Sequence, residues 1–250
     1  MRAFRSALAL LTRLPGGLHY DGDQALGRAL PWFPAVGVVV GLLTALVYVP
    51  LAEVLPPLTA AALAVGFSAV VTGGFHEDGV ADTADALAGG RDAAERLRLL
   101  KDPRHGTFGV LALVVVTLVK VSALASVSGA VAVAALVAAG ALGRSATVAV
   151  LGWTTPVGAG GLGQSYRRSL TGQDLGLALG LGAAVGTLAL GPLLLPTAAL
   201  VGAAAWAVAW WAGRRIGGTT GDVLGAAEQA GECAVLVLVS AIAPGTVWFA

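Results

Sequence analysis

Residues 32–49 read WFPAVGVVVGLLTALVYV, an uncharged run of 18 residues. A bilayer core about 30 Å thick needs roughly 20 apolar residues in a helix, so this run is typical of a membrane span. Gly37 and Gly41 within it form a pair of small residues that lets a second helix pack closely. Six further windows share the apolar character, at about 58–75, 108–127, 130–151, 175–195, 197–213 and 233–249. The sequence therefore predicts an all-α, polytopic integral membrane bundle of about seven transmembrane helices.

The composition of the whole chain agrees with a lipid environment. Of its 250 residues 57% are hydrophobic and 12% are charged, and the mean hydropathy is +0.84. Because an average soluble domain is about 25% charged, this composition excludes a soluble enzyme and a disordered chain. The single cysteine, Cys233, excludes a disulfide scaffold, and a net charge of +1 gives no reason to expect nucleic acid as a partner. We expect one integral membrane domain over residues 1–250, with the lipid bilayer as a partner.

The basic residues predict which side of the membrane each connection faces. Thirteen of the 15 lysines and arginines fall before the first span or in the connections after the second, fourth and sixth. By the positive-inside rule these segments and the N-terminus are cytoplasmic, in the cytoplasmic or inner membrane of the cell. Of the 14 acidic residues only Glu53 falls in a connection on the other side, so we expect any chemistry to face the cytoplasm. Residues 1–14 predict an interfacial amphipathic helix and not a removable signal peptide.

The clearest motif is GGFHEDGVADTAD, residues 73–85, at the cytoplasmic end of the second span. Asp78, Asp82 and Asp85 are spaced i, i+4 and i+7, which places them on one face of a helix. Three like charges repel one another unless a cation lies among them, and oxygen ligands favour Mg²⁺ or Mn²⁺ over zinc. The motif predicts a metal site that shares its ion with substrate phosphates. The alternative is a solvated acidic face at the membrane surface.

Two further polar segments are predicted to face the same side. Residues 101–109, KDPRHGTFG, offer Lys101 and Arg104 to phosphate oxygens, whereas attraction to anionic headgroups is the alternative for the basic residues here. Residues 214–232 contain a Gly-rich stretch with Gly218 and the carboxylates Asp222, Glu228 and Glu232. We interpret this stretch as a second set of carboxylates beside a phosphate-sized turn, the alternative being a plain turn between spans. The catalytic segments are thus about 73–109 and 214–232.

Two cations and two histidines remain to be assigned. Lys120 and Arg144 fall within predicted spans, where an unpaired charge costs at least about 2.5 kcal/mol, so both are expected to face the bundle interior. Each is either an ion-pair partner or an anion-binding group, and Arg144 is the better ligand candidate of the two. His76 and His105 flank the two best motifs, which suits a role in proton transfer.

The predicted cavity, with its carboxylates, glycines and arginines, favours metal-assisted phosphoryl transfer. A divalent cation can orient a diphosphate and offset transition-state charge, while a carboxylate accepts the proton of an attacking hydroxyl. One alternative is a lipid synthase of the CDP-alcohol phosphotransferase type, although the long spacer before that family's final aspartates is missing. The other is a cation-coupled membrane transporter. The acidic residues, however, cluster toward one membrane face and no internal repeat is evident.

A closer similarity covers about residues 4–233. Residues 73–85, 101–109 and 217–232, together with LTRLP at 11–15 and FPAVG at 33–37, occur in the same order as in cobalamin synthase. The chain resembles that family, the adenosylcobinamide-GDP ribazoletransferases. The resemblance implies a Mg²⁺-dependent membrane transferase that joins adenosylcobinamide-GDP to alpha-ribazole or its 5′-phosphate and releases GMP, in the last stage of nucleotide-loop assembly. A homo-oligomer is left open.

The resemblance also assigns roles to the motif residues. Asp78 and Asp82 would hold Mg²⁺ on the diphosphate, and Asp85 would be a further ligand or the base. The catalytic residues would then be Asp82 and Asp85. The metal ligands would be Asp78, Asp82, Asp85, Asp222 and Glu228, and the phosphate or nucleotide would be bound by Lys101, Arg104, Arg144 and Gly218.

Overall fold

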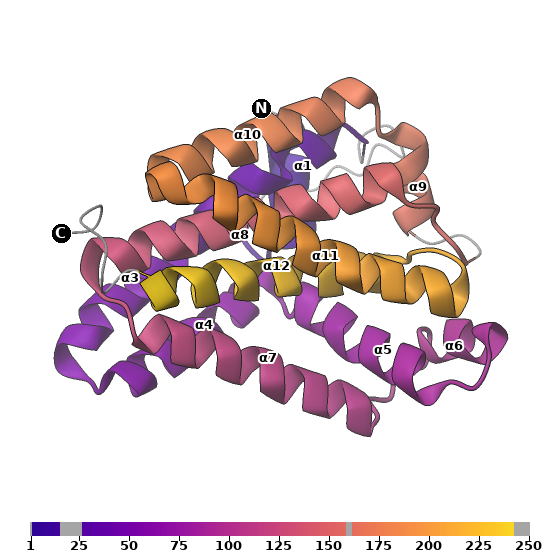
Figure 1. Cartoon of the computed structure of the whole chain (residues 1–250), viewed down its shortest axis with the longest axis horizontal. Helices are drawn as coiled ribbons and strands as arrows, with labels where there is room; N and C mark the ends of the chain where they lie inside the picture. The colour runs from indigo at the N-terminus through magenta and orange to yellow at the C-terminus, as the bar shows by residue number, and fades with distance from the viewer. Residues whose placement is uncertain (1, 16–26, 159–161, 243–250) are drawn as a thin grey trace.

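The computed structural model describes residues 2–15, 27–158 and 162–242. Within these ranges the chain is helical, and the one β-type contact is an isolated bridge between Pro156 and Thr219. The helices are, in order, α1 (Arg2–Leu11), η1 (Leu30–Trp32), α3 (Phe33–Val54), α4 (Pro57–Thr72), α5 (Phe75–Gly89), α6 (Ala93–Leu99), α7 (Thr107–Ala125), α8 (Gly129–Trp153), α9 (Leu162–Ser169), α10 (Gly172–Leu190), η2 (Gly191–Leu193), α11 (Leu194–Ile216) and α12 (Gly221–Ile242). Figure 1 shows the long helices packed as a single bundle.

Long apolar helices account for most of this bundle. Five segments of the described chain are long and apolar enough to cross a membrane, namely Gly27–Val54, Thr107–Ala125, Gly129–Trp153, Gly172–Ile216 and Gly221–Ile242. Gly172–Ile216 contains two helices, α10 and α11, joined by the short η2, and α4 with α5 forms a further candidate span that is bent. The protein is therefore a multi-pass membrane protein, and the predicted all-α bundle of about seven spans is confirmed.

Helix α8 lies at the centre of the bundle. Every residue from Ala138 to Leu151 is buried, and α3, α10 and α12 pack against this helix. Small side chains make the contacts possible: a Cβ at Gly37 would collide with the backbone of Gly140, and a Cβ at Gly41 would collide with that of Leu136. Close approach of backbones through small residues is the usual way in which helices associate in lipid.

A sharp corner separates α4 from α5. Gly73 and Gly74 both have φ of 68°, a left-handed conformation that side-chain-bearing residues rarely adopt, and the two helix axes differ by 93°. The N–H of Arg13 donates to the carbonyl of Val71, which ties the residues after α1 to the end of α4. The Gly-Gly corner thus directs α5, with its acidic motif, away from the axis of α4 (Figure 1).

The last described helix differs from its prediction. Helix α12 begins at Gly221, whereas the sequence predicted a span from 233, and only residues 217–220 separate it from α11. The predicted Gly-rich turn is therefore mostly helix. Its glycines serve packing, because Gly225 lies against His76 and Gly231 lies against Gly143. The predicted end of this span, beyond residue 242, lies outside the described residues.

Candidate active site

Helix α5 and the segment before α7 bring three side chains with metal-binding atoms together. One ligand atom each of Asp78, Asp82 and His105 can be chosen so that all lie within 4.8 Å of one another. The closest atom pairs are His105 Nδ1 with Asp82 Oδ1 at 3.7 Å and His105 Nε2 with Asp78 Oδ1 at 4.0 Å. Among the residues that the structure describes, this is the one group of three or more such side chains with this geometry. Two carboxylates and an imidazole at this spacing fit a divalent cation.

The electrostatics of Asp82 favour the same interpretation. Its side chain is only 16% exposed, whereas that of Asp78 is 63% exposed. Burial, followed by the nearby carboxylates of Asp78 and Asp222, raises the pKa of Asp82 to about 6. A carboxylate that is destabilised by burial and by like charges gains from a bound cation, because the cation reverses the sign of the local field.

Asp85 is placed differently from the other two aspartates of the motif. Its carboxylate accepts hydrogen bonds from the backbone N–H groups of Gly106 at 2.6 Å and Gly109 at 2.8 Å. A Cβ at either glycine would collide with the Asp85 side chain, so both glycines are needed for this contact. Asp85 therefore anchors the first turn of α7 to α5, and this anchor holds the segment that carries His105 beside the acidic cluster.

Asp222 begins the second predicted carboxylate set and lies near the first. It stands in the first turn of α12, and its backbone packs so closely on Gly79 that a Cβ there would collide with the Asp222 carbonyl. The Thr220 hydroxyl lies 3.3 Å from its carboxylate. The close contact between α5 and α12 brings Asp222 within electrostatic reach of Asp78 and Asp82.

Arg144 and Glu228 lie in the interior of the bundle. Arg144 Nη1 is 2.8 Å from Glu228 and 3.0 Å from Glu232, and the Lys120 ammonium donates to Glu232 at 2.5 Å. His76 Nδ1 is 3.2 Å from Glu228. The predicted inward orientation of Lys120 and Arg144 is confirmed. Both are ion-pair partners there, and the ion pairs of Arg144 and Glu228 belong to this interior network and not to the Asp78–Asp82–His105 cluster.

The remaining predicted ligands, Arg104, Lys101 and Gly218, have local surroundings that differ from one another. Arg104 is exposed and forms a bidentate salt bridge with Asp102, with N···O distances of 2.9 and 2.8 Å. These hydrogen bonds lower the pKa of Asp102 to about 2. Lys101 is exposed beside them. Gly218 lies against the carbonyl of Thr155, next to the Pro156–Thr219 bridge, and a Cβ would collide there. The backbone at Gly218 is thus engaged in packing.

Sequence reasoning underestimated His105. It assigned this histidine only a general role in proton transfer, because its distance from Asp78 and Asp82 depends on how α5 and α7 pack. The available signal was its position directly after Arg104 and directly before Gly106. Glu77 was not assigned at all, although it lines a cavity of the bundle.

Fold and site together define a class: a multi-pass helical membrane protein with a potential metal-binding site of carboxylates and histidine at one end of its bundle. The family described as cobalamin-5-phosphate synthase matches residues 3–240. The chain belongs to this family. Membership implies small-molecule substrates and a membrane environment.

Individual relatives agree with the family match. The chain is 40% identical over 251 residues to an adenosylcobinamide-GDP ribazoletransferase of Bradyrhizobium diazoefficiens, with 96% of this chain and 94% of that protein covered. It is 41% identical over 244 residues to a protein of the same name from Ectopseudomonas mendocina, covering 95% of this chain and 98% of the relative. A Pseudomonas aeruginosa protein of that name is 39% identical over 247 residues, with 95% and 97% covered. No solved structure matches the chain.

Proposed function

We propose that this protein is an adenosylcobinamide-GDP ribazoletransferase, which joins adenosylcobinamide-GDP to alpha-ribazole or alpha-ribazole 5′-phosphate and releases GMP. The observation that carries this proposal is the Asp78–Asp82–His105 cluster, in a chain that belongs to the cobalamin-5-phosphate synthase family. The attacking hydroxyl oxygen forms a bond to the phosphorus beside the cobinamide arm. The bond from that phosphorus to the bridging oxygen breaks, and GMP leaves with the bridging oxygen.

The metal we propose is Mg²⁺, held by Asp78 and Asp82. When bound, Mg²⁺ would orient the diphosphate and offset the charge that develops on it. Mg²⁺ sites in proteins use one or two carboxylates together with substrate phosphates, so two aspartates are sufficient. The raised pKa of Asp82 and the crowding of carboxylates around it support this role. Asp222 is near enough to act on the same ion, directly or through water.

Proton transfer and phosphate binding are assigned to neighbouring residues. His105 is 45% exposed and lies beside Asp82, so it can accept the proton of the attacking hydroxyl, a task for which imidazole is well suited near neutral pH. Arg104 can exchange Asp102 for a substrate phosphate, because a guanidinium pairs with either anion through two hydrogen bonds. Lys101 adds a second exposed cation. The anchoring contacts of Asp85 make it a positioning residue and not the base.

The proposed orientation places this site at the cytoplasmic face of the cytoplasmic membrane. The apolar helices and the distribution of arginines support it. In that orientation α5, α6 and the start of α7 all lie at the cytoplasmic end.

The test is turnover by detergent-purified protein. Adenosylcobinamide-GDP and alpha-ribazole 5′-phosphate are supplied with and without Mg²⁺, and GMP and the corrinoid product are measured together. We expect both products in equal amounts, only with the metal, and no turnover by Asp82→Ala. Activity of a well-folded Asp82→Ala variant, or no product from the wild type, would overturn the proposal. CDP-alcohol donors and uptake into proteoliposomes then test the two alternative classes.

A further inference from the structure

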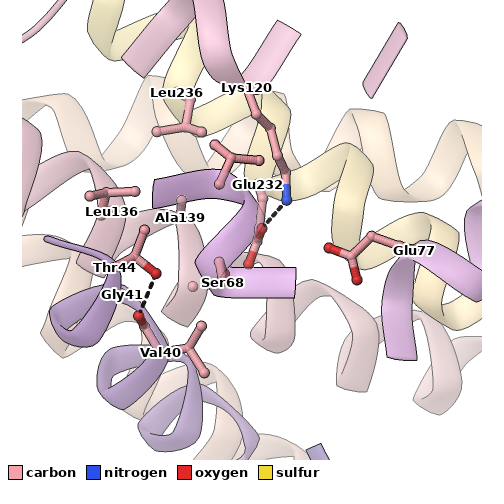
Figure 2. A pocket seen from close by; sticks show the side chains of 12 residues that line it. Val40, Gly41, Thr44, Ser68, Glu77, Lys120, Leu136, Ala139, Glu232 and Leu236 are labelled. Atoms are coloured by element: carbon pink, nitrogen blue, oxygen red, sulfur yellow. Dashed lines mark hydrogen bonds and ion pairs between the residues drawn. The ribbon is translucent and has the colours of Figure 1, made fainter. Parts of the chain in front are cut away.

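A small cavity lies in the interior of the bundle, and its lining does not include the residues of the Asp78–Asp82–His105 cluster. Its volume is about 30 Å³, and its lining comes from α3, α4, α5, α7, α8 and α12. Most of the lining is apolar, but three charged side chains reach it: Glu77, Lys120 and Glu232. In Figure 2 the Glu77 carboxylate points toward the Lys120–Glu232 pair from the opposite side. The cavity is therefore the place where α5 meets the interior ion pairs.

Among the described residues, polar atoms around this cavity have fewer hydrogen-bond partners than they can bind. The Lys120 ammonium has three N–H donors, and one of them donates to Glu232 Oε2. Glu77 Oε2 is buried and has no hydrogen-bond partner. A buried carboxylate oxygen without a partner is costly, and Lys120 carries the one cation among the residues that line the cavity. The hydroxyls of Thr44 and Ser68 line the same space.

The volume decides what can complete these hydrogen bonds. A cavity needs about 10–15 Å³ to hold a water molecule, so this one accommodates one or two. A buried water also needs two to four polar partners, which the carboxylates, the ammonium and the hydroxyls provide. Water is favoured over a cation because the Lys120 side chain itself lines the cavity, and its ammonium would repel a second cation there.

We propose that water in this cavity bridges the Glu77 carboxylate to the Lys120 ammonium, and that the bridge fixes the rotation of α5 and so positions Asp78 and Asp82. Glu77 and Lys120 are then positioning residues. The inference rests on the proposed metal site. Residues 76 and 77 face the interior, where His76 meets Glu228, and Asp78 follows directly on the outer side. Rotating a helix by one residue turns its side chains by about 100°, so these two interior contacts determine where the next aspartates point.

The test measures metal binding separately from turnover. Mn²⁺ serves as the probe, because carboxylate sites accept both ions, and its binding to detergent-purified protein is followed by electron paramagnetic resonance. The variants are Glu77→Gln, Lys120→Met and the double variant, with Glu53→Gln as the matched control at an exposed carboxylate. Glu77→Gln leaves the Lys120–Glu232 pair in place, so folding is expected to be retained and is checked by thermal unfolding.

We expect each single variant to weaken Mn²⁺ binding by about 10- to 100-fold, the range for residues that orient metal ligands. The Mn²⁺ affinity of the double variant should be no lower than that of the single variant with the lower affinity, since both changes break the same water bridge. In turnover assays the loss should appear in the Mg²⁺ concentration for half-maximal rate more than in kcat.

The contrary results distinguish a failure of the water bridge from a failure of the metal site or of the proposed function. Unchanged Mn²⁺ affinity in Glu77→Gln, or additive losses in the double variant, overturns the inference. Binding that depends on Na⁺ at constant ionic strength shows that the cavity holds a cation and also overturns it. A wild type that binds no Mn²⁺ overturns the metal site and this inference together. Normal Mn²⁺ binding without turnover overturns only the proposed function.

Discussion

Asp82 and Asp85 have the same chemistry and lie three residues apart, yet their surroundings give them different tasks. Asp85 is satisfied by two backbone N–H groups at the start of α7. Asp82 is partly buried beside other carboxylates, and among the described residues no backbone N–H donates to it. The spacing in the sequence could predict that both lie on one helix face, but the difference depends on Gly106 and Gly109, which arrive from another element.

This environment predicts a stability cost at Asp82 in the absence of metal. Its pKa in the fold is raised to about 6, above the value in an unfolded chain, so the charged form destabilises the fold as the pH rises through about 4 to 6. Replacing Asp82 by Asn should raise the melting temperature of metal-free protein at pH 7.5 by about 2–4 °C, the change that about 1 kcal/mol produces in a chain of this size.

The difference should disappear at pH 4, where the carboxylate is largely protonated. Thermal unfolding in detergent with a chelator measures both conditions. Asn in place of the exposed Asp92 would be a poor control, because Asp92 caps α6, so Glu53→Gln is used. A less stable Asp82→Asn protein at pH 7.5 would contradict the prediction.

His105 provides a second prediction at the residue scale. Replacing it by Gln keeps a polar side chain of similar length but removes the proton acceptor. We expect kcat to fall by about 10²- to 10⁴-fold, the usual contribution of a positioned acid or base. The Mg²⁺ concentration for half-maximal rate should change by much less, because the two aspartates remain. An equal loss in metal activation would instead make His105 a metal ligand.

At the scale of elements, the apolar windows located the spans well where helices contact lipid. They failed at α12 because Asp222, Glu228 and Glu232 lower the hydropathy of its first half. In the structure the last two of these meet cations from α7 and α8. Lys120 and Arg144 are far from them in the sequence, so a single sequence could predict inward-facing charges but not their partners.

The corner between α4 and α5 provides a third prediction, on the effect of replacing Gly74 by alanine. Gly74 has φ of 68°, and a Cβ there would meet nothing within 4 Å, so Gly74→Ala tests backbone conformation alone. A left-handed conformation costs a side-chain-bearing residue about 1–2 kcal/mol. We expect a lower melting temperature and a weaker metal site, since the direction of α5 changes.

Gly66→Ala is the matched control. Gly66 lies within helix α4 and a Cβ there also meets nothing within 4 Å, so alanine should be neutral or slightly stabilising. Thermal unfolding of the two variants side by side gives the comparison. If Gly74→Ala were as stable as Gly66→Ala and retained its metal affinity, the corner would not be needed to direct α5.

At the scale of the whole molecule, the orientation in the membrane is a prediction that single cysteines can test. In a background with Cys233→Ser, cysteine is placed at Glu53, in the last turn of α3, or at Asp92, ahead of α6. Both positions are exposed. A membrane-impermeant maleimide should label Glu53→Cys in intact cells and Asp92→Cys only after the membrane is opened. The reverse pattern would place the candidate site outside.

The interior ion pairs also constrain the order in which the bundle can be assembled during synthesis. Lys120 and Arg144 are translated about a hundred residues before the carboxylates of α12 that neutralise them. Until α12 enters the bilayer, two cations at lipid depth lack their counter-charges, at a cost of at least about 2.5 kcal/mol each. A nascent chain stopped ahead of Gly221 would therefore be held by the insertion machinery or degraded by membrane proteases, and release of a stable protein would depend on its last described helix.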